Sequence, residues 1–379
     1  MVPTARMAAR LTQVQIKGFK AIYDSGAVPL RPLTLLIGRN GSGKSSLVEA
    51  IQLLQSAAAD GLQQSILDRY RSFDNLLNRR GSAKNRVRFQ LDLLRGAAPL
   101  RYELEFSSVG VLTEECREGR TKAQRQTVRT RSDRVRLIAK GPPIRDRDVL
   151  ALSHVTKTGA TGAKELLDFL RAAVFLRLSP DVLSRPEPLT RPARRPVLDE
   201  TGAGVVALLR ALTKAQRERV ARSVAAIISG VEEVKVLQDA TRGYYATTER
   251  MLSRGGSKAF DVPAWMLSEG TRRLTAIYAL LARTPRPSLL VIEEIENGLD
   301  PWTLQRVFGD LRVAADEGVQ IIVTTHSPFL LDHVGIDDVL HTRREQGDTT
   351  YKPIRSYDDV IKYDGIVMPG AMYASGYFK

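Results

Sequence analysis

The sequence predicts an α/β fold in which a mixed sheet carries functional residues at one edge. Three short apolar runs, at residues 33–37, 288–292 and 320–324, have the length and composition of buried strands. Each run leads directly into glycine-rich or polar residues. Because parallel strands place their carboxyl ends at one edge of a sheet, we expect these residues to gather there.

The first of these runs opens into a phosphate-binding loop. An alternating strand at residues 11–19 precedes it, and residues 38–45 read Gly-Arg-Asn-Gly-Ser-Gly-Lys-Ser, which fits G-x-x-x-x-G-K-[ST]. Residues 46–54 follow with helical spacing of apolar side chains. Strand, glycine turn and helix are the context that this motif requires; the alternative is a glycine-rich turn that binds nothing. If the motif is functional, the backbone N–H groups of the loop and the helix N-terminus hold phosphates. The residues expected to do so are Gly38, Asn40, Gly41, Ser42, Gly43, Lys44, Ser45 and Ser46.

The middle of the chain is expected to contain further strands and helices. Paired strands are predicted at 87–94 and 100–106, with a turn at 96–99, and another strand at 173–178. Residues 185–196 are basic and proline-rich and are expected to lack regular structure. Helices are predicted at 205–212 and 215–228, and a short strand at 234–237.

The chain is strongly basic, with a formal net charge of +15. Residues 117–148 contain eleven Lys or Arg against four Asp or Glu, and Val128, Val135 and Leu137 alternate there with arginines. This pattern indicates hairpin strands with an arginine face. Such a face could bind nucleic acid or an acidic partner. A solvated edge that resists aggregation explains it equally simply, and we favour that interpretation.

The second apolar run ends in two carboxylates, Glu293 and Glu294. One carboxylate at such a position can hold Mg²⁺, together with the Ser45 hydroxyl, and the next can act as general base on water. The alternative is a solvated acidic strand end. Asp300 then precedes Pro301, which is a good start for a helix.

The third run ends near His326, whose imidazole could contact the γ-phosphate and sense hydrolysis. Ser268 and Gly270 stand at the start of another expected helix, where an anion can bind. We expect the phosphate-binding loop to be occupied by the phosphates of its own nucleotide. The second anion site therefore suggests contact with a nucleotide bound to another subunit.

Taken together, these motifs resemble those of the ABC-type ATPase superfamily, which includes SMC and RecF-like proteins. The resemblance matches residues 38–45 to Walker A, 267–270 to the signature, 289–294 to Walker B, 298–301 to the D-loop and His326 to the switch histidine. It implies an ABC-type P-loop ATPase head with a mixed central sheet, an antiparallel β subdomain and a helical signature lobe. It also implies that two heads sandwich ATP and Mg²⁺, with Lys44 and Glu294 catalytic, Ser268 and Gly270 acting in trans, and Asp300 coupling the two sites.

The local sequence motifs are similar to those of stand-alone bacterial AAA ATPases of the OLD/AbiEii type. Many of these proteins take part in phage defence. It includes Ile-Lys-Gly-Phe-Lys at 16–20 and Glu-Glu-x-Glu-Asn-Gly-Leu-x-Pro at 293–301. Glu293 replaces the Asp that is usual in the superfamily, so we expect slow turnover. Residues 327–379 are too few for a fused nuclease domain, so any nuclease is expected to be a separate protein. Gln52 and Gln55 are poor candidates for a Q-loop.

From these features we expect three parts: an N-terminal ATPase lobe at 1–110, a basic insertion and crossing segment at 111–196, and a C-terminal ATPase lobe at 197–379. The expected function is an ATPase that dimerises around ATP, as a homodimer or higher homo-oligomer, and regulates a separate nuclease or toxin in phage defence. A RecF-like repair ATPase that binds DNA is the alternative. The single cysteine and the lack of a long apolar run predict a cytoplasmic protein without membrane partners.

Overall fold

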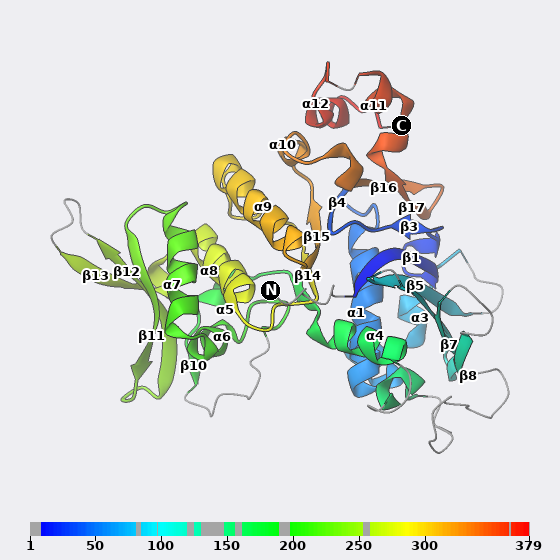
Figure 1. Ribbon diagram of the computed structural model, residues 1–379, viewed down its shortest axis with the longest axis horizontal. Helices are drawn as coiled ribbons and strands as arrows, with labels where there is room; N and C mark the ends of the chain where they lie inside the picture. The colour runs from blue at the N-terminus through cyan, green and yellow to red at the C-terminus, as the bar shows by residue number, and fades with distance from the viewer. Residues whose placement is uncertain are drawn as a thin grey trace, which may run out of the picture. The chain divides into compact units, whose positions relative to one another are not determined.

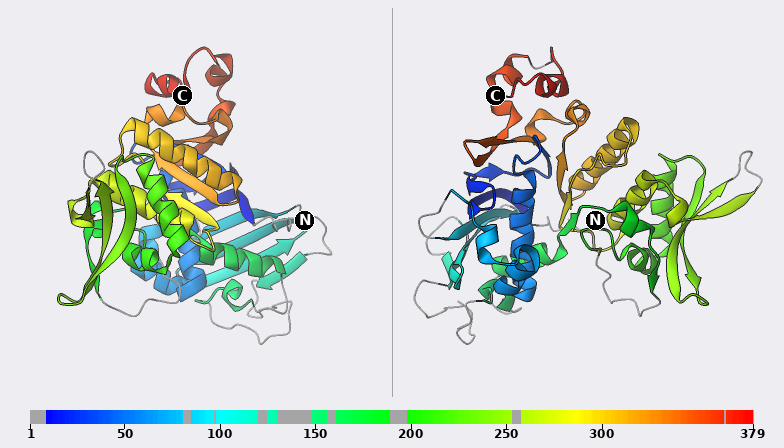
Figure 2. Two further views of the ribbon diagram at one scale, coloured as in Figure 1. Left: turned by 60° about the vertical axis from the view of Figure 1, so that its left-hand side comes forward. Right: turned by 180° about the vertical axis from the view of Figure 1, so that it is seen from behind.

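The computed structural model describes residues 9–80, 85–96, 98–119, 125–129, 148–155, 161–188, 198–252, 258–363 and 365–378. The chain divides into two compact units (Figures 1 and 2). The first unit combines Met1–Ala173 with Gln320–Lys379, and the second is Val174–Val319. In the described part of the chain, no helix is both long and apolar enough to span a membrane.

The first unit contains an antiparallel sheet with the strand order β2-β1-β5-β6-β7-β8, in which β3 also pairs with β1. Its inward face is apolar because buried side chains alternate along β5 and β6, from Val87 and Phe89 to Leu104 and Phe106. The strands are β1 (Arg10–Phe19), β2 (Ile22–Asp24), β3 (Val28–Pro29), β5 (Val87–Arg95), β6 (Ala98–Ser107), β7 (Gly110–Glu118) and β8 (Arg125–Arg129).

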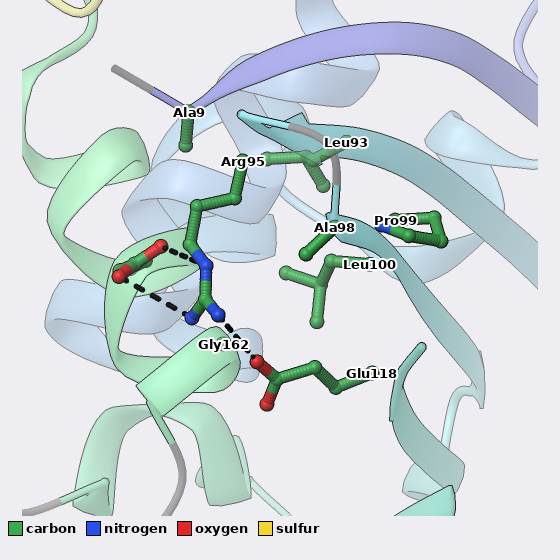
Figure 3. A pocket seen from close by; sticks show the side chains of 9 residues that line it. Ala9, Leu93, Arg95, Ala98, Pro99, Leu100, Glu118 and Gly162 are labelled. Carbon is green, nitrogen blue, oxygen red and sulfur yellow. Dashed lines mark hydrogen bonds and ion pairs between the residues drawn. The ribbon is translucent and has the colours of Figure 1, made fainter. Parts of the chain in front are cut away.

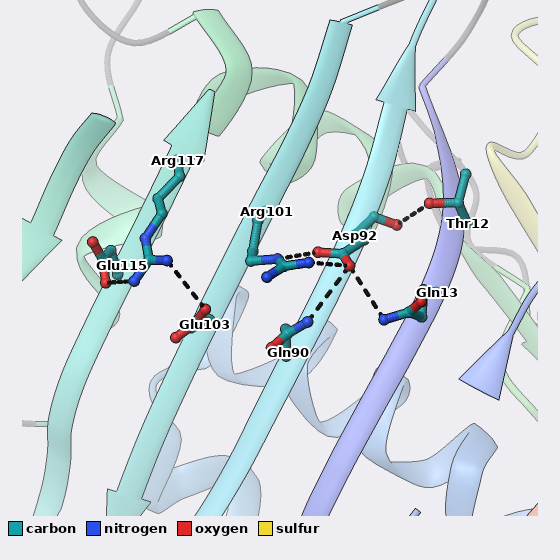
Figure 4. Close-up of polar contacts among 8 residues, drawn as sticks. All are labelled: Thr12, Gln13, Gln90, Asp92, Arg101, Glu103, Glu115 and Arg117. Carbon is teal, nitrogen blue, oxygen red and sulfur yellow. Dashed lines mark hydrogen bonds and ion pairs between the residues drawn. The ribbon is translucent and has the colours of Figure 1, made fainter. Parts of the chain in front are cut away.

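The opposite face of this sheet carries a ladder of charged side chains (Figure 4). Arg101 makes two hydrogen bonds to Asp92 on the neighbouring strand, of 2.7 and 2.9 Å. Arg117 reaches Glu103 and Glu115, at 3.7 and 2.6 Å. Arg101 and Arg117 therefore pair with carboxylates across a solvated face, as cross-strand neighbours do. Most of the basic stretch at 117–148 lies outside the described residues.

Helices cover the inward face of the antiparallel sheet (Figure 1). The Arg95 guanidinium ties α4 to that sheet, because it pairs with Glu118 of β7 at 2.9 Å and with Glu165 of α4 at 3.3 Å (Figure 3). The helices of this unit are α1 (Lys44–Asp60), α2 (Leu62–Tyr70), α3 (Phe73–Leu76), α4 (Thr161–Ala172), α10 (Pro328–Leu331), α11 (Asp358–Lys362) and α12 (Pro369–Ala374), with short 3₁₀ turns at Ala151–His154, Ile336–Asp338 and Ile354–Ser356.

Four strands of the first unit form a mixed sheet that carries the phosphate-binding loop. β4 lies between β15 and β16 and is parallel to both, while β17 adds antiparallel to β16. Every residue of β4 and β15 is buried, as expected for parallel strands covered on both faces. The strands are β4 (Leu33–Ile37), β15 (Gln320–Thr325), β16 (Val339–Glu345) and β17 (Asp348–Pro353).

The second unit combines a parallel strand pair with an antiparallel sheet and helices. β14 runs parallel to β9, and the sheet has the order β10-β12-β11 with β13 on β12. The strands are β9 (Val174–Leu176), β10 (Glu187–Pro188), β11 (Val231–Asp239), β12 (Tyr244–Leu252), β13 (Ala259–Pro263) and β14 (Leu289–Ile292). The helices are α5 (Pro180–Ser184), α6 (Val205–Ala211), α7 (Lys214–Ala225), α8 (Glu269–Ala282) and α9 (Pro301–Asp316), with a 3₁₀ turn at Ala264–Met266.

The α/β class and mixed sheet predicted from the sequence are confirmed, and β4, β14 and β15 begin and end within one residue of the predicted runs. The strand predicted at 234–237 is longer, and β12, β13, β16 and β17 are strands that the sequence analysis did not predict. Residues 189–197 of the proline-rich segment lie outside the described part of the chain. The three-part division at residues 110 and 196 stays a prediction.

Gln320 holds the N-terminal strand to the first residue of β15. Its side-chain oxygen accepts from the backbone N–H of Leu11 at 2.7 Å, and its amide donates to the carbonyls of Leu11 and Arg31 at 2.7 and 3.2 Å. Gln320 is 3% exposed, so water cannot replace these bonds.

We therefore expect Gln320→Leu to lower the free energy of unfolding by about 2–4 kcal/mol, because it leaves buried backbone groups without partners. Urea denaturation followed by circular dichroism measures this. The matched control is Gln64→Leu on the exposed face of α2, which should change stability by less than about 0.5 kcal/mol. Equal midpoints for the two variants would contradict the role assigned to Gln320.

Candidate active site

The phosphate-binding loop connects the buried strand β4 to the start of α1. Gly43 is the residue before that helix, and its φ of +106° is one that only glycine adopts readily. The Lys44 ammonium is 7% exposed and donates to the carbonyl oxygens of Gly38 and Arg39, at 2.7 and 3.2 Å. The lysine is thus held across the mouth of the loop, where it can meet phosphate oxygens.

The β16–β17 hairpin holds this loop from the side, which the sequence did not reveal. The Tyr351 hydroxyl donates to the Gly43 carbonyl at 2.7 Å, and Tyr351 is buried. The Thr349 hydroxyl donates to the carbonyl of Ala21 at 3.1 Å. A Cβ atom on Gly43 would lie only 2.4 Å from Thr349 Oγ1, so the hairpin also requires glycine there. In the sequence, the only sign of this hairpin is that Thr349 and Tyr351 stand at alternate positions. The structure shows that both side chains are buried.

His326 follows β15 and lies beside Lys44, although 282 positions separate them in the sequence. Its Nδ1 atom is 3.4 Å from the Lys44 Nζ atom. An ammonium can only donate, so a hydrogen bond between them requires Nδ1 to accept and places the imidazole proton on Nε2. The structure therefore brings the predicted switch histidine to the predicted phosphate-binding lysine within the first unit.

The acidic strand end lies in the second unit, after β14. The Glu293 N–H donates to the Leu176 carbonyl at 2.8 Å, which extends the pairing of β14 with β9. Glu294 has a φ of +51°, which is unusual for a residue with a side chain and is common at functional sites. Its carboxylate accepts from the Asn297 amide at 2.8 Å, a partner that the sequence analysis did not single out.

The segments predicted to be the signature and the D-loop meet within the second unit. A Cβ atom on Gly270 would lie 2.5 Å from the Gly298 carbonyl oxygen, and one on Gly298 would lie 2.6 Å from the Glu269 side chain. Both glycines are therefore needed for the close approach of the two segments. Gly298 also has a φ of +70°.

Two polar residues begin the helices at this contact. The Ser268 hydroxyl accepts from the Thr271 N–H at 3.2 Å as the N-cap of α8. Asp300 accepts from the N–H groups of Trp302 and Thr303, at 3.0 and 3.1 Å, as the N-cap of α9. A hydrogen bond from the Thr303 hydroxyl does most to lower the pKa of Asp300. The predicted N-cap of Asp300 is confirmed.

A buried polar chain connects the sheet of the second unit to Ser268. Glu249 on β12 accepts from the Thr275 hydroxyl at 2.7 Å, and that hydroxyl also approaches the Thr271 carbonyl at 3.0 Å. The Thr271 and Ser268 hydroxyls are 2.7 Å apart. The second carboxylate oxygen of Glu249 has no partner among the described residues, and burial raises the pKa of Glu249 to about 7.

The donors predicted for Mg²⁺ have suitable chemistry. The Ser45 hydroxyl and the Glu293 carboxylate are hard oxygen ligands, and Mg²⁺ commonly takes one or two protein oxygens and fills its shell with phosphate and water. Among the described residues, no group of three or more His, Cys, Asp or Glu side chains could hold a metal by itself.

Gln55 has a structural role. Its side-chain amide donates to the carbonyls of Leu170 and Ala173, each at 2.8 Å, and so fixes α1 to the end of α4. This agrees with the view that Gln55 is a poor Q-loop candidate. Cys116 is buried, and burial raises the pKa of its thiol to about 12, so it is not a reactive group.

The raised pKa of Glu249 predicts a pH dependence of stability. A carboxyl whose pKa is raised in the folded state stabilises the fold fully below its unfolded pKa of about 4.3, and this contribution is lost as the pH rises through about 7. Glu249→Gln should therefore be more stable than the parent at pH 8, by about 3 kcal/mol, and similar to it at pH 4. Urea titrations at several pH values measure this. Exposed Glu233→Gln is the control, and parallel profiles for the parent and Glu249→Gln would contradict the prediction.

Comparison with known proteins assigns the family. The sequence model described as "AAA domain, putative AbiEii toxin, Type IV TA system" matches residues 33–332. No curated protein matches the chain. An SMC head bound to the C-terminal winged-helix domain of ScpA has a TM-score of 0.55 and 15% identity, and covers 90% of this chain and 97% of its own.

Two further SMC heads resemble this fold. The head from Pyrococcus yayanosii has a TM-score of 0.54 and 9% identity, covering 94% of this chain and all of its own. The head from Pyrococcus furiosus, bound to a ScpA domain, has a TM-score of 0.51 and 13% identity, covering 93% and 99%. The chain therefore belongs to the AAA-domain family that this sequence model describes, and it has the fold of SMC head domains.

Proposed function

We propose that this protein hydrolyses Mg²⁺-bound ATP, that two copies close around the nucleotide, and that this cycle regulates a separate effector. The observation that carries the proposal is the meeting of Lys44 and His326 beside a glycine-built loop, with a Nζ–Nδ1 distance of 3.4 Å. A cation and an imidazole at that position suit a γ-phosphate. The ATPase fold of the family supports this assignment.

Each motif then has a role in the reaction. The N–H groups of the loop and Lys44 bind the phosphates. Ser45 and Glu293 would hold Mg²⁺, which would neutralise part of the negative charge of the phosphates. Glu294 orients and deprotonates the attacking water, and Asn297 fixes its carboxylate. His326 contacts the γ-phosphate and responds to its loss.

The signature is proposed to act on the nucleotide of the partner copy. Ser268 and Gly270 present the N-terminus of the 14-residue helix α8, which attracts negative charge. Large apolar side chains near these segments are exposed: Trp265 by 48%, Met266 by 70% and Trp302 by 81%. Exposed aromatic and Met side chains beside a polar site are typical of surfaces that become buried in assemblies.

The effector is proposed to be a nuclease or toxin used in phage defence. The family description, with its AbiEii toxin and toxin–antitoxin system, supports this class of role. The alternative is a RecF-like repair ATPase that binds DNA directly, and the net charge of +15 favours it. The two functions differ in whether the closed dimer recruits a protein or duplex DNA.

Glu294→Gln is expected to slow ATP hydrolysis by about 10²–10⁴-fold and to accumulate a dimer when ATP and Mg²⁺ are present, because binding survives and the base does not. Mass photometry measures the dimer, and phosphate release measures turnover. Glu296→Gln is the matched control, since it changes a neighbouring acid. A Glu294→Gln protein that stays monomeric with ATP would refute closure of a dimer.

Adding duplex DNA or the product of the adjacent gene to the trapped dimer separates the two functions. A larger complex that forms with the product of the adjacent gene, and not with duplex DNA, supports regulation of an effector. Binding of duplex DNA that weakens steeply with salt supports the repair function.

The tryptophans provide a second test of closure, because Trp265 and Trp302 are the only two in the chain. Dimerisation through the signature surface should move them from water into an apolar contact and shift their fluorescence to shorter wavelength. We expect this shift when ATP is added to Glu294→Gln. It should be absent from a Glu294→Gln protein that also carries Ser268→Arg, whose bulk and charge block the signature. The same fluorescence shift in both proteins would show that the tryptophans are not buried by dimerisation through the signature surface.

A further inference from the structure

An exposed apolar surface lies on α11, on α12 and on the residues that follow each of them (red in Figure 1). We call it the C-terminal surface. It belongs to the first unit, whereas the predicted signature and the two tryptophans belong to the second. A cluster of large exposed apolar side chains marks a surface that becomes buried in an assembly. These side chains are Ile361, Ile366, Val367, Met368 and Tyr377, which are 62, 77, 37, 55 and 42% exposed.

Ring and backbone contacts bring these apolar side chains together. The ring centroids of Tyr363 and Tyr377 are 6.1 Å apart, so the end of α11 lies beside the residues that follow α12. The N–H groups of Ile366 and Val367 donate to the Tyr363 carbonyl, at 2.9 and 3.0 Å. Side chains from separate parts of the sequence therefore form one continuous surface.

The C-terminal surface is held in place by the close packing of α12 on α10. The Gly370 N–H of α12 donates to the Asp332 carboxylate at 2.6 Å, and a Cβ atom on Gly370 would lie only 2.3 Å from the Pro328 carbonyl oxygen. The Met372 side chain of α12 is 1% exposed. Because its backbone is already fixed, this surface loses little conformational freedom when a partner covers it.

The charge of this region differs from that of the whole chain. The chain has a formal net charge of +15, but residues 356–378 contain three Asp and one Lys. A region that is not positive does not attract nucleic acid or an anionic membrane. Two copies of a strongly basic chain repel each other least where their local charge is not positive. The charge distribution therefore favours a second copy of this chain as the occupant of the C-terminal surface.

Opposite charges stand one turn apart on α11. Asp358 and Lys362 lie on the same face of this helix, both are exposed, and neither makes an ion pair with any described residue. The Lys362 ammonium instead lies 5.1 Å from the centroid of the Tyr363 ring. If two copies meet about a two-fold axis with their α11 helices antiparallel, Asp358 of each copy faces the partner's Lys362. The apolar Ile361 is then covered between these charged pairs.

We propose that the C-terminal surface is a contact between two copies of this chain that forms without nucleotide. Ile361, Ile366 and Met368 are buried at its centre, and Asp358 and Lys362 pair across its rim. This contact does not depend on the proposed closure around ATP, which uses the signature in the second unit. When both contacts form, each copy has two different interfaces, so ATP joins the dimers into larger assemblies.

The first test is sedimentation velocity of the full chain without nucleotide, at about 1–50 µM, where small interfaces dissociate. We expect the parent to shift from monomer to dimer over this range. Ile366→Glu and Met368→Glu should each weaken association about tenfold or more, because each places a charge in the apolar centre. The matched control is Leu67→Glu on α2, since Leu67 is 53% exposed and lies outside the C-terminal surface. It should associate like the parent.

Charge exchange tests the arrangement of α11. Asp358→Lys and Lys362→Asp each place like charges opposite one another and should weaken association by roughly three- to tenfold. The double variant restores opposite charges and should associate like the parent. A side chain that only supports the fold would not show this restoration. Unchanged thermal midpoints confirm that the variants are folded.

A parent that stays monomeric over the whole range, or Ile366→Glu and Met368→Glu proteins that associate like the parent, would overturn the proposal. A double variant as weak as the single ones would overturn the antiparallel pairing of α11. If the monomeric parent instead binds the product of the adjacent gene, and Ile366→Glu abolishes that binding, the surface belongs to the effector.

The proposed function can fail separately from this contact. The dimer should form equally in Lys44→Ala, whereas a dimer that requires ATP would be the closure around nucleotide and would overturn a nucleotide-independent contact. Glu294→Gln that forms no additional contact with ATP would refute closure and leave the C-terminal contact intact. At the low concentrations of mass photometry the C-terminal contact dissociates, so that measurement reports closure alone.

Discussion

The conformation of the phosphate-binding loop depends on the hydrogen bond from the Tyr351 hydroxyl to the Gly43 carbonyl. A loop that holds phosphates must point several N–H groups to one place, and it cannot satisfy its own carbonyls by regular pairing. Here Lys44 and Tyr351 donate hydrogen bonds to loop carbonyls, and Thr349 packs against Gly43. The loop is therefore fixed by a hairpin that follows it by some 300 residues in the sequence.

The same arrangement connects the loop to its surroundings. β16 pairs with β4, the strand that leads into the loop, while its partner β17 supplies Tyr351 to the loop itself. The hairpin therefore positions the loop through both strand pairing and side-chain contacts.

In the second unit, a short polar chain lies beside the apolar core at the start of α8. Glu249, Thr275 and Thr271 are buried and link β12 to Ser268, which is exposed. Polar networks of this kind are rigid when satisfied and costly when they are not. Because the second carboxylate oxygen of Glu249 has no partner among the described residues, this network is not fully satisfied. It ends at the exposed start of α8, beside Trp265 and Met266.

The sequence by itself determined the elements whose cause is local. Continuous apolar runs made β4, β14 and β15 evident, and the Asp300–Pro301 pair marked the start of α9, because burial and capping depend on neighbouring residues. Only the tertiary structure decided that β12 and β16 are strands. Buried Thr247, Thr248 and Glu249, and the arginines of β16, conceal the apolar period of two that marks a strand. It also decided that Lys44 meets His326 and that Tyr351 meets Gly43, because these contacts join residues that are distant in the chain and depend on how the strands order themselves in the sheet.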